Sequence, residues 1–61
     1  MRVLASSLKV GDRFSFAGLV GVFTVNHTRR DRQGTWVDYR KQNGTCDATH
    51  LPYGTSVDLR S

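Results

Sequence analysis

Short segments of alternating apolar and polar residues, separated by Gly, Asp and Asn, constrain this chain more than any other feature. Two-residue alternation places one set of side chains on one face of an extended strand. The strongest segment, 22–28, reads Val-Phe-Thr-Val-Asn-His-Thr, with Phe23, Val25 and His27 on its expected core face. Apolar residues at helical spacing do not persist beyond one turn, so the sequence predicts an all-β fold.

Five or six short antiparallel strands are expected. The segments with strand character begin near residues 3, 13, 22, 35, 45 and 56. Asn43-Gly44 is a strong hairpin signal between two of them. Ser6-Ser7-Leu8 is expected to form a turn of 3₁₀ type. Pro52 cannot donate to a strand ladder, so 50–54 is expected to be a turn, with a 3₁₀ turn before the last strand.

The length of 61 residues leaves room for one domain, spanning residues 1–61. A domain of this size buries too little surface to enclose a deep catalytic cleft. Short strands also leave exposed edges unless the sheet closes on itself. We therefore expect a small closed barrel that binds a partner and is not an enzyme.

Targeting and cofactor signals are sparse. No apolar run is long enough for a transmembrane helix, and the first ten residues do not form a signal peptide, so we expect a cytoplasmic protein without membrane contact. Cys46 is the only cysteine, which excludes an internal disulfide. His27 and His50 are not at a metal-ligand spacing, and no motif indicates a metal, a cofactor or a catalytic residue.

Three stretches resemble the SH3-like small β-barrels. Residues 8–14 read Leu-Lys-Val-Gly-Asp-Arg-Phe, similar to the Leu-x-x-Gly-Asp-x-hydrophobic opening of many such barrels. Residues 23–25 resemble their following core strand, and 51–59 resemble their last turn and closing strand. The chain also resembles short proteins encoded by actinobacteria and their phages. The resemblance implies a barrel that contacts nucleic acid or peptides and brings no catalytic residues. The acidic and aromatic groove of eukaryotic SH3 domains is missing, which argues against recognition of proline-rich peptides.

A basic hairpin is the strongest functional signal. The formal net charge is +4, and the hairpin region contributes five basic residues and two aspartates, Asp31 and Asp38, or +3. Hairpin pairing brings Trp36 beside several guanidinium groups. Cations that neutralise phosphates together with an aromatic ring that stacks on a base are typical of nucleic-acid binding. The predicted contacts to DNA or RNA are Arg29, Arg30, Arg32, Trp36, Arg40 and Lys41.

Two alternatives remain open on the sequence. The first is that the basic residues bind no partner and belong to a solvated hairpin tip. In addition, a register shift of one residue would move Trp36 from the outward face into the core. The second alternative is a protein-interaction module, such as a phage-encoded one that engages a host or structural protein. It would offer Leu19, Val20 and Trp36 or an unpaired strand edge to an acidic or apolar protein surface. The sequence leaves the oligomeric state open.

Overall fold

The computed structural model describes residues 1–16 and 20–60. Its elements are β1 (Arg2–Leu4), the 3₁₀ turn η1 (Ala5–Ser7), β2 (Arg13–Ser15), β3 (Phe23–Arg30), β4 (Gly34–Arg40), β5 (Cys46–Pro52) and β6 (Ser56–Arg60). All strand pairs are antiparallel and form one sheet in the order β1-β6-β2-β3-β4-β5. The prediction of an all-β fold with five or six antiparallel strands is confirmed, and the number in the described residues is six. The sheet is open, with β1 and β5 at its edges, and the expected closure into a barrel is not seen in the described residues.

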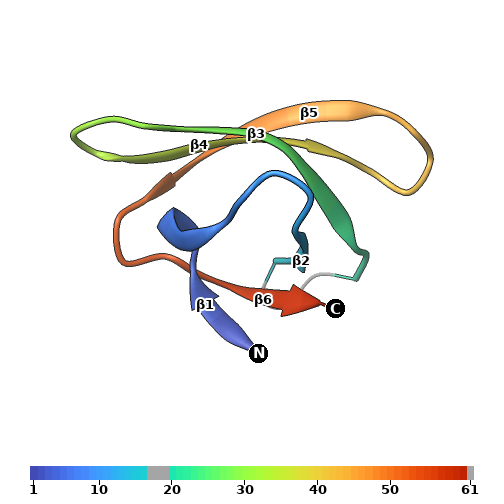
Figure 1. The fold of residues 1–61 in the computed structure, drawn as a ribbon, viewed down its shortest axis with the longest axis horizontal. Helices are drawn as coiled ribbons and strands as arrows, with labels where there is room; N and C mark the ends of the chain where they lie inside the picture. Colours follow the sequence, from blue (N-terminus) through green and yellow to red (C-terminus); the bar gives the residue numbers. More distant parts are fainter. Residues whose placement is uncertain (17–19, 61) are drawn as a thin grey trace.

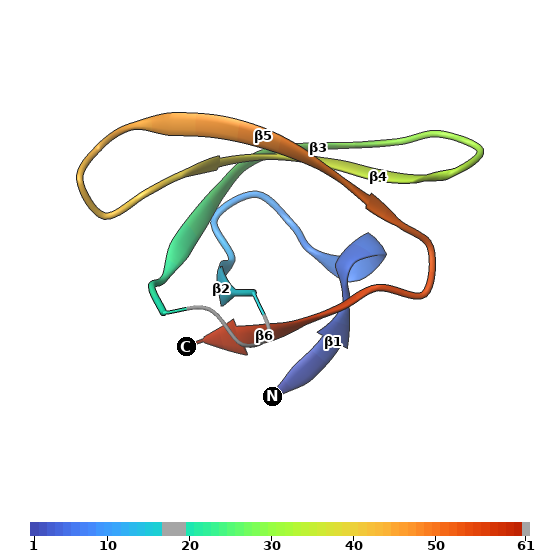
Figure 2. The same ribbon diagram turned by 180° about the vertical axis from the view of Figure 1, so that it is seen from behind.

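The open sheet curls around one core. Figure 1 shows β3, β4 and β5 as an upper layer, β1, β2 and β6 as a lower layer, and η1 between them, and Figure 2 shows the same arrangement from behind. The buried apolar residues come from both layers and from η1. They are Ala5, Leu8, Phe14, Val25, Val37, Tyr39 and Val57. Two-residue alternation in 13–16, 35–41 and 56–59 predicts that Phe14, Val37, Tyr39 and Val57 point inward, and all four are buried.

Four aromatic rings join the two layers at one end of the core. Phe14, Phe16, Phe23 and Tyr39 all contact one another, with ring centroids between 5.1 and 6.1 Å apart. Such pairs each contribute roughly 0.5–1.5 kcal/mol beyond the area they bury. Burial, together with the nearby charge of Asp47, raises the pKa of Tyr39. The cluster therefore fixes β2 and the start of β3 against β4.

A β-bulge in β3 reverses which side chains face the core. Val25 pairs with Tyr39, but the next pair is His27 with Asp38, so Asn26 is an extra residue. Beyond it Thr28 takes the inward position and His27 is exposed. The prediction that His27 lies on the core face was therefore wrong, because strict alternation does not continue through a bulge.

The turn before β6 also differs from its prediction. β5 runs on to Pro52, because an edge strand tolerates a residue without an N–H group. Thr55 then donates its N–H to the carbonyl of Pro52 at 3.1 Å, and Gly54 has a φ of +93°. A 3₁₀ turn needs negative φ, so this is a β-turn of type II. The 3₁₀ turn in the described residues is η1, which covers two of the three residues expected after the first strand.

The β3–β4 hairpin is tighter than expected. The polar run 29–34 predicts a hairpin connection in which Gly34 takes a left-handed conformation. In the structure the connection covers only 31–33, because β3 continues to Arg30 and β4 begins at Gly34. Gly34 does not take the expected left-handed conformation. It permits close approach of β5: a Cβ there would collide with the carbonyl oxygen of Leu51 and lie 2.7 Å from Pro52 Cα. The predicted hairpin at Asn43-Gly44 is confirmed, with Gly44 in the left-handed region.

Candidate functional site

The pairing of β3, β4 and β5 sorts their solvent-facing side chains into three rows. Residues paired across antiparallel strands project on the same side of the sheet. The rows are Arg29–Trp36–His50, His27–Asp38–Ala48 and Thr24–Arg40–Cys46. These nine residues are called the outer face below. Rows two residues apart lie about 6.7 Å from each other, so the first and third rows are roughly 13 Å apart.

Trp36 is the aromatic centre of the outer face. Its neighbours along β4, Thr35 and Val37, are buried on the other side of the sheet, so the alternative that places Trp36 in the core is excluded. The residue is 36% exposed, and its ring centroid lies 5.0 Å from that of His50. Arg29 pairs with it from β3. The indole is therefore accessible and has a guanidinium group on the adjacent strand.

Arg29 and Arg30 lie on opposite sides of the sheet. Arg30 donates from its guanidinium to the carbonyl of Ser6 at 2.5 Å and so ties the hairpin to η1. The side chain of Arg29 has no hydrogen bond or ion pair within the described residues and is exposed. Of these two predicted phosphate contacts, only Arg29 belongs to the outer face.

The hairpin tip is organised by the carboxylate of Asp31. Its Oδ1 accepts hydrogen bonds from the N–H groups of Gln33 and Gly34, both at 2.8 Å, and lies 3.3 Å from Nε2 of His50. The two backbone donors, followed by His50, hold the pKa of Asp31 below its usual value of 3.8. Tyr53 donates its hydroxyl to the Asp31 carbonyl at 2.6 Å. These bonds hold the tip against the end of β5, next to Trp36.

The remaining predicted contacts are dispersed. Arg32 is exposed at the hairpin tip, and Lys41 lies beyond the far end of β4, with its Nζ 3.9 Å from Asp47. Arg40 is exposed in the third row of the outer face. The structure thus brings Arg29, Trp36 and Arg40 onto one face and places Arg30, Arg32 and Lys41 elsewhere.

Arg13 is a cation of this region that the sequence did not indicate. It pairs with Thr24, so it extends the third row onto β2. The alternation in 13–16 predicts only that Arg13 points away from the core, on the side of the strand opposite to Phe14. Its position beside Arg40 follows only from the pairing of β2 with β3, which no local pattern reveals.

The predicted protein-binding patch is not brought together in the described part of the chain. Leu19 lies outside the described residues. Val20 is fully exposed just before β3, whereas Trp36 pairs near the opposite end of that strand. Elsewhere in 1–16 and 20–60, no three His, Cys, Asp or Glu side chains gather as metal ligands. The same residues include no helix long and apolar enough to cross a membrane.

No model of a known protein family matches the chain, and no curated protein or solved structure matches it significantly.

Proposed function

We propose that the chain is a non-enzymatic binding domain of SH3-like type that holds single-stranded nucleic acid, DNA or RNA, on its outer face. One observation carries this proposal: the row Arg29–Trp36–His50 sets an accessible indole between a cation and an imidazole on one face of a sheet. Stacking of a base on such a ring stabilises binding by about 1–3 kcal/mol, whatever the base.

The distribution of charged side chains also supports binding of nucleic acid on the outer face. Arg13, Arg29 and Arg40 project from it, and no carboxylate lies within 4.0 Å of their guanidinium groups among the described residues. Asp38 is the one acidic residue in the three rows. Guanidinium groups bind phosphate through paired hydrogen bonds, so these arginines supply the backbone contacts while Trp36 supplies the stacking.

The test is a fluorescence-anisotropy titration of labelled single-stranded DNA and RNA at low and at raised salt. Trp36→Ala should weaken binding by about 5- to 150-fold, which corresponds to the loss of one stacked base. Trp36→Phe keeps a ring and should retain most of the affinity. Absence of binding by the wild type at low salt, or equal affinity of the alanine variant, would refute the proposal.

The open edge of β5 favours a second candidate, a protein-interaction domain. β5 pairs with β4 on one side, and no strand of residues 1–16 or 20–60 pairs with its other side. An extended segment of a partner can add to such an edge through main-chain hydrogen bonds. A partner that remains bound after nuclease treatment and in high salt would favour this function over the first.

A further inference from the structure

A cavity of about 150 Å³ lies between the third row of the outer face and the β4–β5 hairpin. It is lined by Arg13, Val22, Thr24, Arg40, Lys41 and Gln42. Drug-sized ligands occupy clefts of roughly 300–1,000 Å³, so this cavity suits one small group. Arg13, Arg40, Thr24 and Gln42 supply two guanidinium groups, a hydroxyl and an amide, and no carboxylate of the described residues lines the cavity, so it favours an anion. The ammonium of Lys41 lies 3.9 Å from Asp47 instead.

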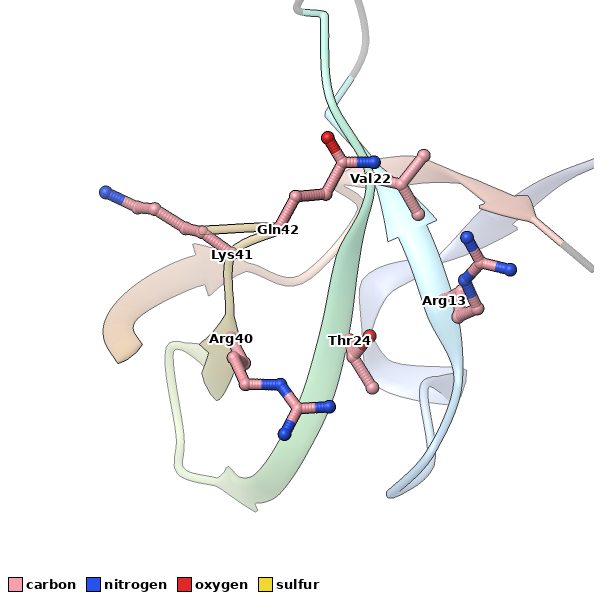
Figure 3. Close-up of a pocket in the computed structure, with 6 residues that line it drawn as sticks. All are labelled: Arg13, Val22, Thr24, Arg40, Lys41 and Gln42. Carbon is pink, nitrogen blue, oxygen red and sulfur yellow. The ribbon is translucent and has the colours of Figure 1, made fainter. Parts of the chain in front are cut away.

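Strand register places the two arginines on either side of one hydroxyl. Arg13 on β2 and Arg40 on β4 both pair with Thr24 on β3. Figure 3 shows their guanidinium groups flanking Thr24, while the ammonium of Lys41 points away from them. Neighbouring strands are about 4.8 Å apart, so the two Cα atoms lie roughly 10 Å from each other. Long side chains from such positions can converge on a single ligand.

The two guanidinium groups have no competing partner. No hydrogen bond or ion pair within the described residues engages the side chain of Arg13 or Arg40, and both residues are exposed. Arg60, which pairs with Arg13, instead donates from Nε to Ser15 at 3.1 Å. Two cations without counter-ions beside one hydroxyl donor create a local positive potential that a tetrahedral oxyanion neutralises.

We infer that Arg13, Thr24 and Arg40 form a binding pocket for one phosphate group of a nucleic-acid strand that crosses the outer face. The identification of this phosphate as part of a nucleic acid rests on the proposed function. Because Arg40 lies roughly 13 Å along β4 from Trp36, the pocket fixes the strand at a second point. Phosphate contacts of this kind set the register of a strand without reading its sequence.

The experiment is an NMR titration of ¹⁵N-labelled protein at constant ionic strength, with inorganic phosphate in one series and a short oligodeoxynucleotide in the other. Both ligands should produce saturable shifts at Thr24 and at the side-chain Nε–H of Arg13 and Arg40. Arg13→Gln and Arg40→Gln should each weaken both ligands by about 10-fold or more, and Thr24→Val by several-fold. Arg2→Gln, on the edge strand β1, removes the same charge and should weaken neither by more than about twofold.

The outcomes separate the pocket from the proposed function. If inorganic phosphate produces saturable shifts but the oligonucleotide does not bind, the proposed function is refuted, and so is nucleic acid as the source of the bound phosphate. Oligonucleotide binding that depends on Trp36 but is weakened no more by Arg40→Gln than by Arg2→Gln would refute the pocket and keep the function. Phosphate shifts that do not saturate, or that spread over all basic residues alike, would overturn the pocket as well.

Discussion

Arg29 and Arg30 are adjacent in the chain and chemically identical, yet the structure assigns them different roles. Arg29 is exposed on the outer face beside Trp36, whereas Arg30 bonds the carbonyl of Ser6 on the other side of the sheet. Replacing each in turn with glutamine removes the same charge from neighbouring positions. The pair therefore tests whether the face of the sheet, rather than the total charge, determines binding.

The expected size of each effect follows from the contacts. Arg13 and Arg40 together neutralise one phosphate and Arg29 neutralises a second, which gives a slope of log K against log salt of about −1.4 for a single strand. A rise from 50 to 200 mM salt then weakens wild-type binding about 7-fold. Arg29→Gln lowers the slope to about −0.7 and the weakening to about 2.6-fold. Arg30→Gln should leave the slope at the wild-type value.

Thermal stability should depend on Arg30 and not on Arg29, the reverse of what is expected for binding. Arg30→Gln removes a charge-assisted hydrogen bond at an exposed site, at a cost of about 1 kcal/mol. In a domain of this size that lowers Tm by about 4–8 °C. Arg29→Gln should change Tm by less than about 4 °C, because its side chain has no hydrogen-bond or ion-pair partner in the described residues.

Anisotropy titrations at the two salt concentrations and thermal melts followed by circular dichroism measure both properties on the same samples. A changed salt slope in Arg30→Gln, with an unchanged slope in Arg29→Gln, would refute the assignment of the two faces.

Three further predictions concern stability. Gly34→Ala should destabilise the fold by about 1–3 kcal/mol in urea unfolding, because its Cβ would meet the Leu51 carbonyl, and an unchanged midpoint would contradict that contact. Thr35→Val should raise stability by about 1 kcal/mol in the same assay, since the buried hydroxyl of Thr35 has no partner among the described residues; a loss would show that the hydroxyl is bonded. Folding lowers the pKa of Asp31 below its usual value of 3.8. Ionised Asp31 therefore contributes to the stability of the fold above pH 3.8, and this contribution is lost as the pH falls through the lower pKa of the folded state. Asp31→Asn keeps an acceptor oxygen but does not titrate, so its stability should fall less steeply than that of the wild type below about pH 4.

Alternation within each strand was enough to predict most of the core. Phe14, Val25, Val37 and Val57 are fully buried, as two-residue periodicity requires when one face of a sheet packs inward. The same pattern placed Trp36 outward, where the structure has it. Phe14, Val37, Val57 and Trp36 were predictable because their strands contain no bulge, and Val25 was predictable because it precedes the bulge in β3.

Features that depend on pairing between strands were not predictable. The bulge at Asn26 leaves no distinctive mark in the sequence, yet it determines which of the two adjacent arginines faces outward. The role of Gly34 depends on how closely β5 approaches, and the position of Arg13 beside Arg40 depends on β2 pairing with β3. Local patterns indicate faces within a strand, whereas the candidate site is built across four strands.

Trp36 is the only tryptophan in the chain, so its emission reports directly on the outer face. Titration with an unlabelled single-stranded oligonucleotide at low salt should quench this emission saturably, with a midpoint equal to that from anisotropy, and added salt should reverse the quenching. An oligonucleotide that binds by anisotropy but leaves the emission of Trp36 unchanged would contradict the claim that a base stacks on this face.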